Sequence, residues 1–246
     1  MNVFIWGPPL WRILHSVAYV MPDNKAVFHT VATNIMTLSH VLPCIHCRRS
    51  FRQYVTELGP PTQGNLIRWM YDLHEKVNTK LDEQAMTDCL KGNKRALAAV
   101  NASKCVLRGK RLSFECLLKR HKVRPVNVTP QDVFDVLFVL SLNFPHKDTE
   151  MYDKKRENYQ AFIETFYTVL QVLTLQNKLY TPLHEVASLY NTYRNTPMRN
   201  GYEMFTATTM LWCNFYKYMY NKTLQQQLFA KYSVAKASAC KHGSCL

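Results

Sequence analysis

Apolar side chains recur every three to four residues along most of this 246-residue chain, and this spacing restricts its fold more than any other feature. Residues three and four apart share one face of an α-helix, so each such segment predicts an amphipathic helix. The chain has only 7 glycines and is rich in Leu, Met, Tyr and Lys. That composition favours helices over sheets. The sequence therefore predicts an all-α protein.

Proline, glycine and capping residues mark the ends of the expected helices. Pro8 lies in the first turn of the first helix, Pro22 follows its end, and Gly59-Pro60-Pro61 ends a later one. Thr129 followed by Pro130 predicts a capped helix start. The other expected helices span 6–19, 27–41, 47–58, 65–81, 157–175, 183–193 and 202–229, while 91–120 is expected to be loop with short helices.

Charge and hydropathy limit the classes of partner. The chain carries 31 basic and 17 acidic side chains, a net charge of +14, which attracts polyanions nonspecifically. No basic run is interleaved with base-stacking aromatics, so we expect nucleic-acid contact to be nonspecific at most. The longest apolar stretch, near 136–142, is too short to cross a bilayer, and residues 1–6 lack a secretory signal. We therefore expect a cytoplasmic protein without a membrane partner.

The segment Pro43-Cys44-Ile45-His46-Cys47 carries the strongest chemical signal. In the first turn of a helix, unpaired N–H groups and the helix dipole stabilise a thiolate, which is the form that exchanges with disulfides. The same spacing also occurs in half of a zinc site and in pairs of buried structural thiols. The chain has 8 cysteines and no visible secretory signal, which favours redox chemistry because cytosolic disulfides are usually catalytic.

Three further features accompany this pair. The opening helix carries Trp6-Gly7-x-x-x-Trp11-x-x-x-His15. The helix over 65–81 places His74, Asn78 and Leu81 on one face. A second cysteine pair, Cys240-x-x-x-x-Cys245, lies in a polar C-terminal segment that has little to pack.

In this order, the four features resemble the Erv/ALR family of FAD-dependent sulfhydryl oxidases. The resemblance covers roughly residues 6–105 and the tail cysteines. It implies a small helical bundle that holds FAD between its helices, usually as a homodimer. The two-part chain and its tail pair look most like the sulfhydryl oxidases of large DNA viruses, which implies the host cytosol or the virion as the location.

The resemblance also implies roles for individual residues. Cys47 would lie against the isoalloxazine ring and pass electrons to it, and Cys44 would be the outer cysteine that an incoming thiolate attacks. The remaining implied cofactor contacts are Gly7, Trp11, His15 and Tyr19 on the first helix, and His74, Asn78, Lys80 and Leu81 on the later one.

The adenine side departs from the family pattern. Cys89 and Cys105 resemble the second disulfide of the family, but fifteen residues separate them, one fewer than usual. Cys116 is therefore a rival partner for Cys89. Glu75 stands where the family usually has asparagine, and the family's tryptophan before the last cysteine is absent.

Together these features predict a route for electrons. Protein dithiol substrates would reduce Cys240/Cys245, which would reduce Cys44/Cys47, then FAD and finally molecular oxygen, with hydrogen peroxide as product. A mobile second pair is useful because a cysteine beside the flavin cannot easily reach bulky substrates. The predicted domains are an oxidase domain at 1–120, a helical accessory domain at 125–230, and a mobile tail with the shuttle cysteines at 231–246.

The accessory domain contains an internal echo of the first half. Residues 10–22 align without gaps to 133–145, with His15 answered by Phe138. Trp69, Asn78 and Leu81 are echoed at the same spacing by Trp212, Asn221 and Leu224, with His74 answered by Lys217. One hypothesis is a degenerate copy of the oxidase bundle, and the other is two amphipathic helices with the same period.

A second functional class stays open, a zinc-stabilised helical adaptor without catalysis. Cys240, His242 and Cys245 place three possible ligands close together, and His46 offers a fourth. The prediction that we carry forward is the thiol oxidase, with no metal.

Overall fold

The computed structural model describes residues 3–90, 100–101, 106–107, 113–116, 118, 128–145, 152–175 and 181–240. These residues divide into two compact units. Unit 1 combines residues 1–52 with 126–246, and unit 2 comprises residues 53–125. The predicted domain division near residue 120 is therefore not the division between the compact units, and the predicted domain bounds stay a prediction.

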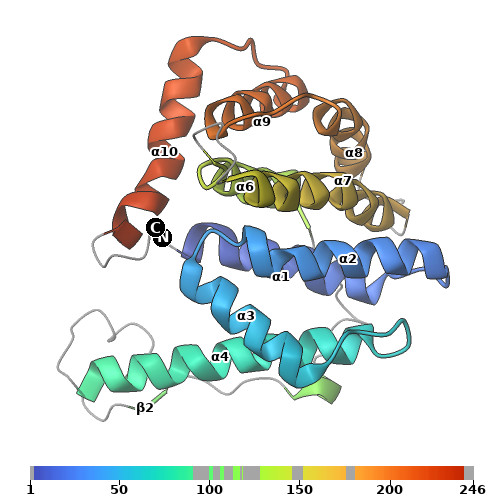
Figure 1. The fold of residues 1–246 in the computed structure, drawn as a ribbon, viewed down its shortest axis with the longest axis vertical. Coiled ribbons are helices and arrows are strands. Elements are labelled where there is room, and N and C mark those ends of the chain that lie inside the picture. The colour runs from blue at the N-terminus through green and yellow to red at the C-terminus, as the bar shows by residue number, and fades with distance from the viewer. Residues whose placement is uncertain are drawn as a thin grey trace. The chain divides into compact units, whose positions relative to one another are not determined.

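Unit 1 is a stack of three helix layers (Figure 1). In the first layer, α1 (Val3–Tyr19) packs on α6 (Pro130–Ser141), and α2 (Lys25–Val41) packs on α7 (Asp153–Leu175). On the other side, α8 (Thr181–Arg194) packs on α7 and α9 (Gly201–Tyr216) packs on α6. The all-helical prediction is confirmed for this unit, whose middle layer is covered on both sides.

Polar contacts fix the first layer of unit 1 on the second. Asn34, buried on α2, donates its side-chain amide to the Phe162 carbonyl and to the Thr165 hydroxyl of α7, each at 3.0 Å. Arg12 of α1 forms an ion pair with the buried carboxylate of Asp132 on α6, with Nε 3.1 Å from Oδ1. Buried polar groups are stable when they are hydrogen-bonded, so these contacts also fix the register of the helices.

The predicted start of α6 is confirmed. Thr129 caps the helix, its hydroxyl accepts a hydrogen bond from the Asp132 backbone, and Pro130 occupies the first turn. The Asp132 carboxylate accepts a hydrogen bond from the Thr129 backbone N–H at 2.8 Å, which completes a capping box. The carboxylate of Asp132 therefore both pairs with Arg12 and takes part in the helix cap.

The predicted single helix over 202–229 is wrong. It is broken into α9 and α10 (Lys222–Cys240) by Lys217, which has a left-handed backbone with φ of 59°. The N–H of Lys217 donates to the Cys213 carbonyl, and Tyr218 stacks on Trp212. Local packing thus ends the helix at a residue that is neither glycine nor asparagine.

α10 continues through the residues where the sequence predicts the start of a tail. It is helical to Cys240. Tyr232 on α10 donates its hydroxyl to the Asp135 carboxylate of α6 at 2.6 Å and accepts from the Gln131 amide at 3.1 Å. The base of α10 is therefore anchored to α6, while the mobility predicted for 231–246 stays a prediction.

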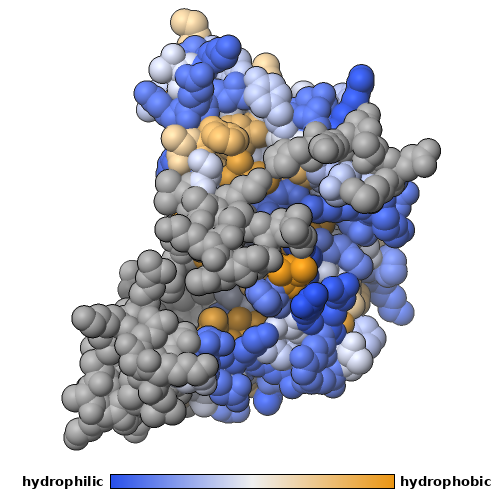
Figure 2. All heavy atoms as spheres, turned by 60° about the vertical axis from the view of Figure 1, so that its left-hand side comes forward, coloured by the Kyte–Doolittle hydropathy of each residue, from blue (hydrophilic) through white to orange (hydrophobic). Residues whose placement is uncertain are grey.

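The connection between α9 and α10 exposes apolar surface. Figure 2 shows apolar side chains gathered at the level of α9 and the upper part of α10. Met219 in the connection is 84% exposed, and Met210 of α9 and Phe229 of α10 are also exposed. Within the described ranges, no helix is both long enough and apolar enough to cross a membrane.

Unit 2 contains the second part of α3 (Ile45–Leu58) and α4 (Leu66–Leu90). Gly59 ends α3 with φ of 71°, a backbone that side-chain-bearing residues rarely adopt. Its carbonyl accepts a hydrogen bond from the indole N–H of Trp69 at 2.8 Å, which joins the turn to α4. A two-residue antiparallel pair, β1 (Val100–Asn101) with β2 (Val106–Leu107), is a small exception to the all-α prediction.

The two parts of the internal echo differ in outcome. Its first part lies in α1 and α6, which pack on each other. Its second part does not share a structure, because Trp69, Asn78 and Leu81 all lie in α4 whereas Trp212 and Leu224 lie in separate helices. The degenerate copy therefore stays a hypothesis for the first part only.

Candidate active site

The Cys44–Cys47 pair lies at the start of α3, as the sequence predicts. Cys44 immediately precedes the helix, and its carbonyl accepts the first helical hydrogen bond, from the Arg48 N–H at 3.0 Å. Its sulfur accepts a hydrogen bond from the backbone N–H of Cys47 at 3.2 Å. Cys44 thus occupies the capping position with sulfur in place of the usual oxygen. Both sulfurs are half-buried and reduced.

This geometry lowers the pKa of Cys44 from 9.0 to about 6. The largest cause is the hydrogen bond from the Cys47 side chain, which outweighs burial; burial acts in the opposite direction. The backbone N–H groups of Cys47 and His46 and the charge of His46 lower the pKa further. At neutral pH Cys44 is therefore a thiolate, the nucleophilic form of cysteine.

Helices of unit 1 support the turn that precedes Cys44. The Arg48 guanidinium bonds the Leu42 carbonyl. Tyr159 of α7, fully buried, donates its hydroxyl to the Val41 carbonyl at 3.1 Å. Pro43 lies in an apolar site that Trp6 and Leu10 of α1 also line. Three helices therefore hold the approach to the redox pair.

The predicted cofactor residues of α1 follow one face of that helix. Gly7, Trp11, His15 and Tyr19 are spaced four apart, which brings them onto one side. Gly7 is buried and the other three are half-buried. The Trp11 and His15 rings lie 5.7 Å apart with an angle of 34°. A side chain on Gly7 would first meet Val3 of the same helix, at 2.9 Å, so the crowding there arises within α1.

Trp6 carries a buried N–H donor whose partner is missing from the described part of the chain. Buried donors without a partner are uncommon and costly, so this indole suits a polar acceptor that binds from outside the chain. Together with a thiolate pair and the aromatic side of α1, it fits part of a flavin cofactor. Sequence reasoning placed Trp6 in the motif but did not assign it this role.

The predicted α4 residues occupy a face of unit 2. His74 and Asn78 are half-buried and Leu81 is 55% exposed. The Asn78 amide donates to the Glu75 carboxylate at 3.1 Å. Glu75, the position at which the sequence departs from the family pattern, thus directly contacts a predicted cofactor residue. A carboxylate there orients the Asn78 amide and adds negative charge beside it.

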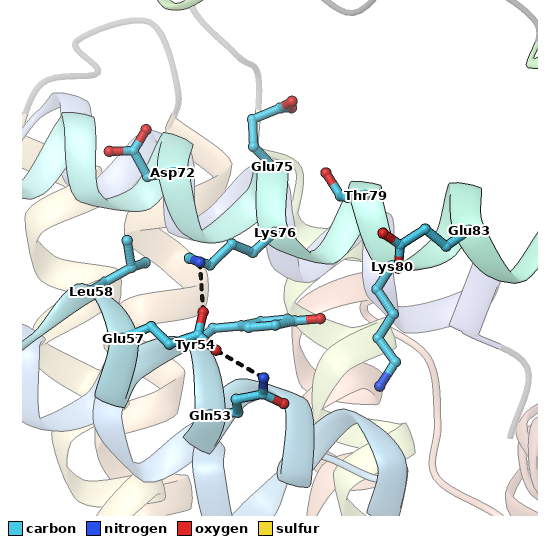
Figure 3. A pocket seen from close by; sticks show the side chains of 10 residues that line it. All are labelled: Gln53, Tyr54, Glu57, Leu58, Asp72, Glu75, Lys76, Thr79, Lys80 and Glu83. Carbon is cyan, nitrogen blue, oxygen red and sulfur yellow. Dashed lines mark hydrogen bonds and ion pairs between the residues drawn. The ribbon is translucent and has the colours of Figure 1, made fainter.

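Lys80 lies apart from that face. It lies six residues after His74, which is about 120° away around a helix of 3.6 residues per turn. Figure 3 shows Lys76 and Lys80 extending from α4 toward α3, where they line a groove of about 720 Å³. The structure therefore does not place Lys80 with His74 and Asn78.

Charge pairs organise this groove. Lys76 binds Glu57 at 2.6 Å and lies over the Tyr54 ring, and Gln53 donates to Glu57 at 2.8 Å (Figure 3). Sequence reasoning missed the groove. Its only sequence signal was the polar face that these residues form on α4, which is usual for a solvated helix.

Several predicted residues fall outside what the structure describes. Cys89 lies near the end of α4 and Cys240 is the last residue of α10, but their side chains are not described. Cys105 and Cys245 lie outside the described residues. Cys116 is an exposed thiol and Cys213 is buried. Across the described ranges, no three His, Cys, Asp or Glu side chains are grouped to hold a metal ion.

Comparisons with known proteins agree with the position of this site. The Erv1 / Alr family model matches residues 8–96. The mitochondrial FAD-linked sulfhydryl oxidase ERV1 of Saccharomyces cerevisiae is 37% identical over 81 residues, which is 30% of this chain and 42% of the yeast protein. No solved structure matches the chain. Residues 8–96, which contain the Cys44–Cys47 pair and most of the predicted faces of α1 and α4, are therefore the part of the chain that is similar to the Erv1/Alr family.

Proposed function

We propose that the chain is an FAD-linked thiol oxidase that makes disulfide bonds in protein substrates. The proposal rests on the geometry of Cys44. Its sulfur caps α3 and accepts a hydrogen bond from the Cys47 N–H at 3.2 Å, and its pKa is lowered to about 6. The family match at residues 8–96 supports the proposal from an independent direction. The match covers 42% of the yeast protein's length and 30% of this chain.

The chemistry follows from the two sulfurs. A substrate thiolate attacks the Cys44 sulfur of the Cys44–Cys47 disulfide, that bond breaks, and Cys47 leaves as a thiolate. The second substrate thiolate attacks the substrate sulfur of the mixed disulfide, and Cys44 leaves. The low pKa of Cys44 makes it a good leaving group. The substrate gains a disulfide, its two protons pass to solvent, and its two electrons remain on the reduced pair.

The cofactor contacts that the sequence resemblance implies are proposed for each unit by itself. In unit 1 these are Gly7, Trp11, His15 and Tyr19 with Cys47, and the proposal is supported by the indole N–H of Trp6, which has no partner among the described residues. In unit 2 they are His74, Asn78 and Leu81, with Lys80 on the groove side of α4. When bound, FAD accepts the electron pair and passes it to oxygen, giving hydrogen peroxide.

The second cysteine pair is proposed to carry electrons from bulky substrates to Cys44. Cys240 ends α10, and Tyr232 anchors that helix to α6 through Asp135. This anchor gives the segment with Cys240 and Cys245 a fixed base in unit 1, which also contains Cys44. Protein dithiols are the proposed substrates for this route.

Two further parts of the proposal have the sequence resemblance as their support. One is a homodimeric assembly. The other is a large DNA virus as the source, with the host cytosol or the virion as the place of action.

The first experiment is an absorption spectrum of the purified chain, followed by oxygen consumption driven by a small dithiol. We expect bound flavin, and peroxide formation that Cys47→Ser abolishes. A colourless chain that contains zinc and consumes no oxygen would contradict the proposal and favour the adaptor hypothesis.

The tail pair is tested separately. Cys240→Ser is expected to spare oxidation of a small dithiol and to slow oxidation of a reduced protein. Full activity of this variant on the protein would show that the tail pair is not a shuttle, and would leave the role of Cys44 and Cys47 intact.

A further inference from the structure

Basic side chains follow the Cys44–Cys47 pair on α3, and others lie at the neighbouring ends of α2 and α7. No acidic residue occurs between Asp23 and Glu57, although this stretch contains three arginines that follow the pair closely. We define the basic rim by its residues in unit 1: His40, His46, Arg48, Arg49, Arg52 and Lys154.

His40 connects the parts of the rim that lie on α2, α3 and α7. His40 lies in the last turn of α2 and Lys154 in the first turn of α7, and the Tyr159–Val41 hydrogen bond joins these two helix ends at 3.1 Å. Burial, followed by the charges of Arg52, Lys154 and Arg48, lowers the pKa of His40. Cations of α3 and α7 therefore lie within electrostatic range of the same imidazole.

Most of the rim faces solvent. His40, His46, Arg49 and Arg52 are exposed, and the Lys154 side chain is 86% exposed. Among the residues that the structure describes, Glu157 pairs with Lys154 at 3.1 Å and Asp153 pairs with Arg156 on α7. On α3, Arg48 bonds the neutral Leu42 carbonyl and Arg49 is exposed. Together with the lack of acidic residues from 24 to 56, this makes the segment that contains Cys44 strongly basic.

We propose that the basic rim selects anionic dithiol substrates, namely protein segments with Asp or Glu next to the cysteines that are oxidised. This inference rests on the proposed oxidase function and adds its substrate class. Opposite charges raise the rate of encounter and suppress wrong partners. Nearby cations also favour the thiolate form of an incoming cysteine, which is the form that attacks Cys44.

The chain's own tail has no acidic side chains that could occupy the rim. No acidic side chain occurs after Glu203, while Lys231, Lys236 and Lys241 flank or enter the segment with Cys240. The tail therefore does not neutralise the positive charge of the rim, which stays available to an acidic substrate segment. A nucleic acid is a poorer occupant, because the two aromatic side chains of α3, Phe51 and Tyr54, are buried and offer no stacking surface.

The test uses two synthetic peptides with the same cysteine pair, one flanked by aspartates and the other by serines. With the full-length, flavin-loaded chain, kcat/KM is expected to be higher for the acidic peptide than for the neutral one. Added salt is expected to lower kcat/KM for the acidic peptide and to change it little for the neutral peptide. Arg49→Glu or Lys154→Glu is expected to lower the acidic-to-neutral ratio by about three- to tenfold at low salt.

Lys222→Glu is the matched control, because it makes the same change of net charge on exposed α10, away from the rim. It is expected to leave the peptide ratio unchanged. Equal ratios for the rim and control variants, or equal salt slopes for the two peptides, would overturn the proposal. So would competition by an oligonucleotide that abolishes the preference more strongly than an acidic peptide without cysteines.

A flavin-free experiment separates this proposal from the oxidase function. A single-cysteine form of each peptide is presented, as a mixed disulfide with a chromophoric thiol, to the Cys47→Ser chain. Cys44 attacks the peptide sulfur, releases that thiol and stays bound to the peptide by a disulfide. Mass spectrometry identifies the peptide attached to Cys44. Faster reaction of the acidic peptide, lost in Arg49→Glu, supports the rim even if no oxygen is consumed. Equal rates with both peptides contradict the rim even if the enzyme turns over.

Discussion

The backbone N–H of Cys47 points at the sulfur of Cys44, 3.2 Å away, so that one redox cysteine caps the helix that carries the other. The arrangement stabilises the reduced pair with Cys44 ionised. Stabilising the reduced form makes the corresponding disulfide a stronger oxidant. The local geometry of α3 thus sets the direction of electron flow from substrate to protein.

The pH dependence of Cys44 reactivity tests this geometry. Alkylation of Cys44 by a neutral reagent is expected to follow a pKa of about 6. Because the folded pKa lies below the ordinary value of 9.0, the thiolate contributes its full stability to the reduced fold above about pH 9. That contribution declines as pH falls toward 6 and is lost below it.

Cys47→Ala removes the side-chain donor that lowers the pKa most, so the alkylation profile is expected to move to higher pH. Cys47→Ser keeps a hydroxyl donor and serves as the control, with a smaller shift. Identical profiles for the wild type and Cys47→Ala would show that the Cys47 side chain does not stabilise the thiolate.

A matched pair of tyrosines tests the support behind the redox pair. Tyr159 and Tyr190 are both fully buried, and each donates to a backbone carbonyl at 3.1 Å, of Val41 and Ile163 respectively. Replacing either with phenylalanine is expected to cost about 1–2 kcal/mol in unfolding free energy, because a buried acceptor loses its donor. Urea titration measures this loss.

Only Tyr159→Phe is expected to change the alkylation rate of Cys44, because Val41 lies three residues before that cysteine. Tyr190→Phe controls for general destabilisation. An equal change in Cys44 reactivity in both variants would show that the Val41 contact has no specific role.

The ion pair between Arg12 and Asp132 tests the packing of α1 on α6. Asp132→Asn removes the charge partner of Arg12 and weakens the capping box with Thr129. The expected loss of stability is roughly 2–4 kcal/mol, since the Asp132 side chain is only 4% exposed. Thermal and urea unfolding measure it.

Asp72→Asn is the control for that prediction. It breaks the i,i+4 pair with Arg68, whose side chain is 56% exposed. Such surface pairs contribute about 0.5 kcal/mol or less. Similar losses in the two variants would mean that burial of the Asp132 carboxylate adds nothing to the interaction.

The anchor of α10 is tested by hydrogen exchange. Tyr232→Phe removes the hydroxyl that Asp135 accepts at 2.6 Å and to which Gln131 donates. The amides of α10 are expected to exchange about five- to thirtyfold faster, equivalent to about 1–2 kcal/mol. Tyr218→Phe, on the exposed connection before α10, is the control, and an equal effect there would contradict the anchor.

Local sequence signals predicted the helices because each signal acts within a few residues. The Thr129-Pro130 start and the position of Cys44 at a helix entrance are of this kind. The break at Lys217 had no such signal, because the surrounding residues tolerate a helix and the stop comes from packing around Trp212. The sequence predicted that this helix ends at residue 81, whereas α4 continues to Leu90 through a polar stretch that lacks a stop signal.

Contacts between distant segments were beyond prediction from local pattern. Arg12 and Asp132 are 120 residues apart, and neither position carries a motif that names its partner. The same holds for Tyr159 and the carbonyl before the redox pair. At the site, the cysteines and the α1 face followed from motif spacing, whereas the basic rim and the groove beside Lys80 required the packing of helices.

Unit 1 is discontinuous in the chain, and this has a consequence for synthesis. The N-terminal helices leave the ribosome well before α6 and α7, so apolar side chains such as Val31 and Ile35 remain uncovered in the nascent chain. Tyr159 is made 118 residues after Val41, whose carbonyl it binds. Cys44 and Cys47 therefore lack the support of α7 until most of the protein has been translated.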